Sequence, residues 1–71
     1  MPLALADQGQ TVYINKINGK DDTRKFLTNL GFTVGSEVTV ISELGGNMIL
    51  KVKETRVALD KKMAQRIIVS Q

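Results

Sequence analysis

The sequence predicts a small, mainly β protein: a barrel of about five strands, with one short helix between the first two strands and a single helical turn before the last. Three observations lead to this fold class. Apolar and polar residues alternate with period two in several short runs, which is the pattern of half-buried strands. The segment Leu44-Gly45-Gly46-Asn47 separates two such runs and is typical of a tight hairpin. Apolar residues at helical spacing occur in one longer segment, 22–30.

The first strand is expected over residues 10–18, and the helix follows it. Within the strand, Val12, Ile14 and Ile17 alternate imperfectly with polar residues. The helix is expected over Asp22–Leu30, with an apolar stripe of Phe26, Leu27 and Leu30. Asp21 or Asp22 can cap its start by accepting backbone N–H bonds, and Gly31 stands where a left-handed residue ends a helix.

The remaining strands follow in quick succession. They are expected over 36–43, 47–53, 55–59 and 67–69, and residues 60–64 read as one capped helical turn. In the strand over 47–53, alternation places one set of side chains in the core and the other set outside. The inward set is Met48, Leu50 and Val52, and the outward set is Lys51 and Lys53. A meander closed by a helical turn and a last strand is the arrangement of an SH3-like barrel.

Length and composition narrow the function. With 71 residues the chain is about half the usual ~150-residue domain, so residues 1–71 are expected to form one domain. The chain contains no cysteine and no histidine, which excludes disulfides, thiolate nucleophiles, imidazole bases and Cys/His zinc sites. No apolar run approaches the ~18 residues of a membrane span, and the first residues lack a secretory signal. We therefore expect a soluble protein of a reducing cytoplasm, not inserted in a membrane.

The acidic residues do not suggest a catalytic or metal site. The seven carboxylates are scattered, and the one adjacent pair, Asp21-Asp22, lies where a helix cap belongs. General acid–base catalysis needs a second group positioned in a cleft. Ferrous iron prefers imidazole together with carboxylate ligands, and no imidazole is available here. No catalytic residue, no metal ligand and no cofactor are expected, and the chain is not predicted to be an enzyme.

A longer pattern runs through the whole chain. Residues 27–38 read L-x-x-L-G-x-x-x-G-x-x-V, preceded by Gly9-Gln10 and followed by Gly45-Gly46-Asn47, by Arg56-Val57-Ala58-Leu59 and by 64–69. In this order the sequence resembles the ferrous iron transport protein A (FeoA) family. The resemblance implies an SH3-like fold and a non-enzymatic, cytosolic accessory role in ferrous iron uptake. The partner it implies is FeoB, a membrane transporter with a cytoplasmic GTP-binding domain, which the protein would bind and modulate.

The residues themselves suggest where a partner could dock. Because Leu27 points about 100° away from Phe26 on the helix, we expect Leu27 to stay partly exposed, together with Arg24 and Leu44 at the hairpin tip. The alternative is that the whole apolar stripe belongs to the core. Lys51 and Lys53 would add an electrostatic rim for an acidic partner.

Other interpretations of the basic residues remain open. The net charge of +3 and the lysines of the third strand also fit a plain solvated face, or a small-barrel nucleic-acid binder. Nucleic acid is not the expected partner, because the chain has only three aromatic residues and the helix region claims two of them. A further alternative is the related SH3-like domain of metal-dependent repressors. Self-association is compatible with so small a core.

Overall fold

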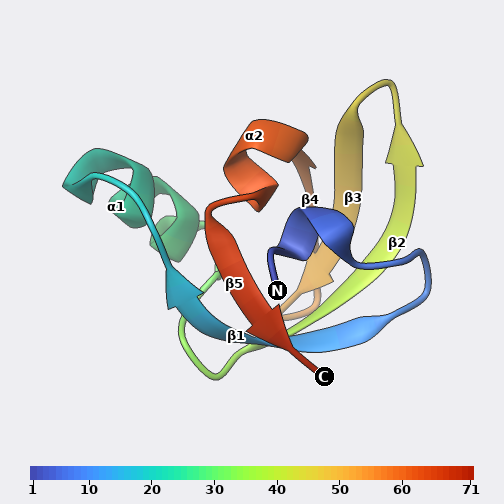
Figure 1. Ribbon diagram of the computed structural model, residues 1–71, viewed down its shortest axis with the longest axis horizontal. Helices are drawn as coiled ribbons and strands as arrows, with labels where there is room; N and C mark the ends of the chain where they lie inside the picture. The colour runs from blue at the N-terminus through green and yellow to red at the C-terminus, as the bar shows by residue number, and fades with distance from the viewer.

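The computed structural model describes residues 1–71, and its strands form one antiparallel sheet in the order β4-β3-β2-β1-β5 (Figure 1). The predicted architecture is confirmed, with one helix between the first two strands and a helical turn before the last. The elements are η1 (Leu3–Leu5), β1 (Thr11–Ile17), α1 (Asp21–Asn29), β2 (Glu37–Leu44), β3 (Asn47–Val52), β4 (Thr55–Asp60), α2 (Lys61–Ala64) and β5 (Ile67–Ser70).

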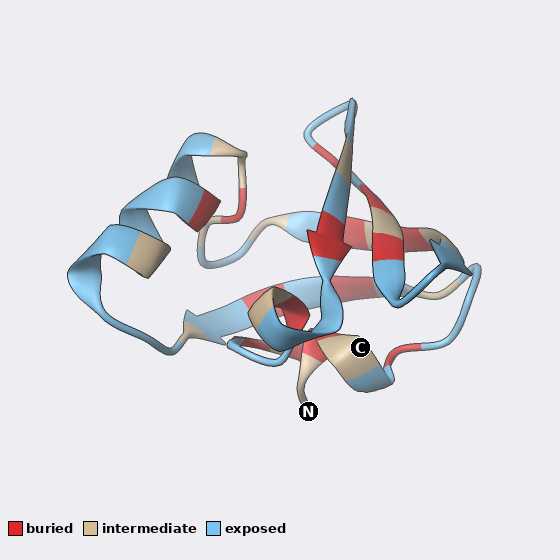
Figure 2. Cartoon of the chain, turned by 90° about the horizontal axis from the view of Figure 1, so that it is seen from above, coloured by how far each residue is buried: buried red, intermediate tan, exposed pale blue.

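The sheet curls around one apolar core, which Figure 2 shows as buried segments concentrated in the strands while α1 is almost wholly exposed. The predicted faces of β3 are confirmed: Met48, Leu50 and Val52 are fully buried and Lys51 is exposed. No polar or charged residue is buried. Packing of aliphatic side chains therefore provides the stability of the barrel.

The imperfect alternation in β1 has a structural cause. Val12 and Ile14 are buried, and the pairing of β1 with β5 then shifts by one residue between Ile14 and Lys16. Such a β-bulge adds a residue to one strand and reverses the face on which later side chains lie. Ile17 therefore returns toward the core, and the odd spacing marks the bulge.

The two ends of α1 differ in how well the sequence predicts them. The expected carboxylate caps are wrong: Lys20 is the N-cap, no side chain caps the helix, and Asp21 and Asp22 lie within its first turn. There their charges still favour the helix dipole. At the other end Gly31 has φ +109°, its N–H bonds to the Thr28 carbonyl, and the N–H of Phe32 bonds to the Leu27 carbonyl. These two bonds form a Schellman motif.

The short helix α2 follows the prediction closely. Asp60 is its N-cap, and its Oδ1 accepts a hydrogen bond of 2.8 Å from the backbone N–H of Met63. In the preceding strand β4, Leu59 is buried and Val57 is half-buried, whereas Thr55 is exposed. The inner face of β4 is therefore buried in its second half only.

The turn between β3 and β4 departs from the prediction. Strand β3 ends at Val52, so Lys53 lies in a two-residue turn with Glu54 and not in the strand. Lys53 has φ 48° and Glu54 has φ 64°. Positive φ at both positions identifies a type I′ turn, which usually contains asparagine and glycine. The side chain of Lys53 therefore leaves from a turn and not from the outer face of a strand.

Candidate partner-docking surface

The outer part of α1 presents an aromatic side chain that differs from the expected residue. The expectation that Leu27 is partly exposed is wrong, because Leu27 is fully buried and is the only buried residue of α1. Phe26 is instead 50% exposed. Leu30 is half-buried and packs against the core. The apolar stripe therefore divides into a core residue, a half-buried residue and one exposed aromatic ring.

The Schellman motif explains this division. It fixes Leu27 and Phe32 on the same side of the helix end, and both side chains belong to the buried cluster. With Leu27 turned to the core, a rotation of about 100° brings Phe26 to the rim of the buried face. Arg24 lies on the exposed part of α1, as expected, in a shallow depression lined by Asp21, Arg24, Lys25, Thr28 and Asn29.

The hairpin tip lies far from this helix. Leu44 is 74% exposed at the end of β2, as expected. In Figure 1, however, α1 and the tip of the β2–β3 hairpin stand at opposite ends of the molecule. Arg24 and Leu44 therefore do not form one contiguous patch, and a partner that touches both must span the barrel.

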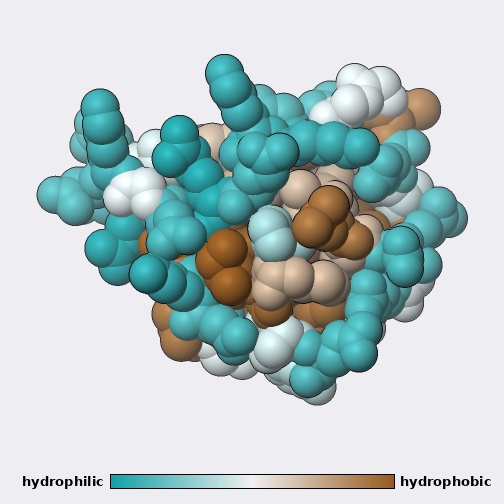
Figure 3. Space-filling model, in the orientation of Figure 1, coloured by the Kyte–Doolittle hydropathy of each residue, from teal (hydrophilic) through white to brown (hydrophobic).

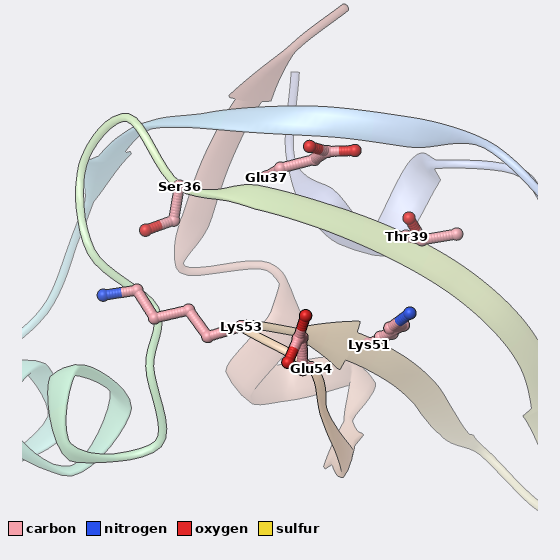
Figure 4. Close-up of a pocket in the computed structure, with 6 residues that line it drawn as sticks. All are labelled: Ser36, Glu37, Thr39, Lys51, Lys53 and Glu54. Carbon is pink, nitrogen blue, oxygen red and sulfur yellow. The ribbon is translucent and has the colours of Figure 1, made fainter.

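The structure brings Lys51 and Lys53 together in an open depression of about 410 Å³. Its lining is entirely polar, as Figure 4 shows, and consists of Ser36, Glu37, Thr39, Lys51, Lys53 and Glu54. A Cβ built on Gly31 would lie 3.7 Å from Cδ of Lys53, so the stem of this lysine passes beside the end of α1. The two lysines are balanced by two glutamates, so the depression is not an anion site and suits mixed polar contacts.

An apolar surface around the first residues was not predicted from the sequence. In Figure 3 hydrophobic side chains gather over η1 and β5, with hydrophilic ones around them. Met1 is 45% and Leu5 is 69% exposed, and Ile68 is half-buried. Pro2 bridges to Ile68, and the backbones of Met1 and Val69 exchange hydrogen bonds, which hold this segment against β5. The apolar run Leu3-Ala4-Leu5-Ala6 is the feature of the sequence from which this surface could have been predicted.

The model of the FeoA domain matches residues 1–71. The chain belongs to the FeoA family. A similar protein of Methanocaldococcus jannaschii bears the name Fe(2+) transport protein A; it is 31% identical over 68 residues, which are 96% of this chain and 83% of that protein. Proteins of this family are non-enzymatic accessory proteins of ferrous iron transport, so the predictions of family and of no enzymatic activity are confirmed.

Solved structures agree with this assignment. A crystal structure of an iron uptake regulatory protein (FeoA) has a TM-score of 0.89 and 30% identity, covering 97% of this chain and 92% of that one. FeoA of Stenotrophomonas maltophilia, described as an SH3 domain protein, has a TM-score of 0.86 and 26% identity, covering 99% and 89%. The SH3-like fold of this FeoA-family chain is thereby confirmed.

The repressor alternative is supported in fold alone. A manganese-dependent transcriptional repressor matches 100% of this chain but the chain covers 41% of that protein, with a TM-score of 0.87 and 21% identity.

The Stenotrophomonas structure was solved in complex with zinc. In the present FeoA-family chain no three Asp or Glu side chains converge as a metal site would require, and the one ion pair joins Lys61 Nζ to Glu43 Oε2 at 3.3 Å. Neither α1 nor α2 has the length and apolar character of a membrane span.

Proposed function

We propose that this FeoA-family chain acts in the cytoplasm as one domain that docks on the cytoplasmic GTP-binding part of a FeoB-type ferrous iron transporter and modulates it. The observation that carries the proposal is the match of the FeoA domain to residues 1–71, together with a relative named as an Fe(2+) transport protein. An accessory protein without a catalytic centre acts through recognition, and its surface chemistry determines where.

The exposed apolar side chains are the best candidates for anchors. Binding energy at interfaces concentrates in aromatic and apolar residues that become fully desolvated, with polar groups around them. Phe26 takes the anchoring role first expected for Leu27, and Leu44 offers a second anchor at the hairpin tip. Arg24, Lys51 and Lys53 are exposed, and their charges would mainly speed the encounter with an acidic partner, to an extent that Glu37 and Glu54 beside the two lysines reduce.

One observation favours the nucleic-acid alternative. Lys51 lies directly opposite Arg56 in the β3–β4 ladder, and neither forms an ion pair within the chain. Like charges placed opposite each other are unfavourable unless an anion joins them. Binding of single-stranded nucleic acid also needs exposed aromatic rings on which bases can stack. Tyr13 is an exposed ring of the sheet, but it lies on β1, two strands away from β3. One isolated ring cannot stack several successive bases, so docking on a protein is the stronger proposal.

Replacing Phe26 by aspartate is expected to reduce capture of the transporter's GTP-binding region at least tenfold while the chain stays folded. The aspartate cannot make the apolar contacts of the Phe26 ring, and its carboxylate loses its hydration when the partner covers it. The measurement is binding of the purified GTP-binding region to immobilised chain, with circular dichroism to verify the fold.

Two further variants make this experiment specific. Thr28→Asp introduces the same charge at an exposed position of α1 and should leave capture within about twofold. Leu44→Asp tests the hairpin tip separately. Normal capture by folded Phe26→Asp, with loss in Leu44→Asp, would move the interface to the hairpin. If the immobilised chain retained RNA but not the GTP-binding region, and moderate salt abolished this retention, the partner would be nucleic acid and not the transporter.

A further inference from the structure

Strand β4 has one edge without a partner. It is the last strand in the order β4-β3-β2-β1-β5, and all six of its residues pair with β3 on the other side. The opposite edge of the sheet is different, because Pro2 bridges to Ile68 and Met1 exchanges backbone hydrogen bonds with Val69. The N-terminal segment thus covers β5, whereas nothing covers β4.

The register shows which backbone groups are free. Lys61 donates its N–H to the carbonyl of Gly46 at 3.3 Å, which fixes the alternation along β4. Leu59, Val57 and Thr55 therefore direct their backbone groups toward β3, and the even-numbered residues of the strand direct theirs away from it. None of the backbone hydrogen bonds that form outside the helices and the strand ladders includes Arg56 or Ala58. Their N–H and carbonyl groups form an open edge that can accept another strand.

The side chains on this edge are complementary to themselves. Arg56, Ala58 and Asp60 are all exposed and occupy the outer face of β4. If a second copy of the chain lies antiparallel with Ala58 at the two-fold axis, Arg56 stands opposite Asp60 of the second copy, twice over. Ala58 meets its own equivalent, where a small side chain lets the strands approach. On the inner face Val57 stands opposite Leu59 of the second copy.

The backbone alternation agrees with this pairing. Residues that face each other in a hydrogen-bonded antiparallel pair must both direct their groups outward. Ala58 and its equivalent meet this condition and can exchange both bonds, and the N–H of Asp60 can reach the carbonyl of Arg56 in the second copy. A shift by one residue would place inward-bonded groups opposite outward ones and lose the ladder.

The charges of the free chain favour the same arrangement. Arg56 faces Lys51 across the ladder and has no acidic partner, since the ion pair present in the structure joins Lys61 to Glu43. Asp60 uses Oδ1 to cap α2, and no hydrogen bond occupies its other carboxylate oxygen. A second copy supplies the missing acid to Arg56 without disturbing the cap.

We propose that two copies of this chain associate through β4 in an antiparallel, two-fold arrangement centred on Ala58, which joins their sheets into one. The contact is small, so the association should be weak and dependent on concentration. It leaves α1 and the β2–β3 hairpin unused, and it therefore goes beyond the proposed docking on the transporter and can fail or hold independently of it.

The test uses matched charge reversals and sedimentation equilibrium. The wild-type chain at high concentration and low salt should approach twice its 7.8 kDa mass. Arg56→Glu alone, or Asp60→Lys alone, places like charges together twice in each homodimer and should weaken association by roughly tenfold or more. An equal mixture of the two variants has only opposite charges across the axis and should recover dimers. Lys25→Glu reverses a charge at an exposed position of α1, away from the β4 edge, and should leave association unchanged.

A second variant tests the backbone hydrogen bonds of the proposed contact. Ala58→Pro removes the central edge N–H without touching the ladder to β3, so it should abolish dimers while circular dichroism stays native. Wild-type chain that remains monomeric at high concentration would overturn the proposal. So would dimers that persist in Ala58→Pro, or a mixture of the two charge variants that fails to associate although each variant is folded. Loss of dimers in Lys25→Glu would place the contact on α1 and overturn the proposal as well.

Discussion

Replacing Leu50 by alanine is expected to leave most molecules unfolded at room temperature. Leu50 is fully buried in β3, opposite Val40 on one side and Val57 on the other. Removing its side-chain atoms costs about 2–5 kcal/mol, through lost burial and the cavity left behind. A single core in a domain of this size supplies a net stability of only about 3–5 kcal/mol. Urea denaturation followed by circular dichroism measures the loss.

Lys51→Ala is the matched control, one residue along the same strand. Its side chain lies outside the barrel and forms no ion pair, so the free energy of unfolding should change by no more than about 0.5 kcal/mol. Comparable losses at the two positions would contradict the burial described for β3. They would mean that the inner and outer faces of this strand are not distinct.

Replacing Leu27 by aspartate should have an equally large effect, and for a different reason. Leu27 is fully buried in the apolar core, and the core contains no polar group that could pair with a carboxylate. An unpaired charge in such a place is costly enough to unfold a small domain. Loss of partner binding by this variant would therefore report unfolding and not a missing contact.

The neighbouring position separates these two effects. Phe26→Asp adds the same charge one residue earlier, on a half-exposed ring, and should keep a cooperative thermal transition. Thermal denaturation of the two variants side by side is the measurement. A folded Leu27→Asp would show that α1 can detach from the barrel while the sheet remains intact.

Most of the sheet could be predicted because its strands bury one face each. In β3 the period of two places Met48, Leu50 and Val52 in the core and Lys51 outside, and the only apolar residue on the outer face is the half-buried Ile49. The glycines of the β2–β3 hairpin and Asp60 before α2 have local roles that depend only on neighbouring residues. Local chemistry of this kind is visible in a single sequence.

The candidate site was harder to predict because it depends on how elements meet. The spacing of Phe26, Leu27 and Leu30 defines an apolar side of a helix, but the rotation of that side against the barrel is set by the Schellman turn and Phe32. The exposed patch at η1 exists because the first residues pack on β5, far along the chain. The turn that contains Lys53 could not be predicted, because Lys53 and Glu54 occupy the positive-φ positions where asparagine and glycine are usual.

The way α1 is attached has a consequence for its motion. Its one fully buried side chain, Leu27, is in the last turn, and its first turn has no side-chain cap. Nine residues are too few for a helix to be stable by itself in water. The first turns of α1 should therefore open and close at a small cost in free energy, as a unit separate from the global unfolding of the sheet. Amide hydrogens there should exchange much faster than those of β2 and β3, and a bound partner should slow them most.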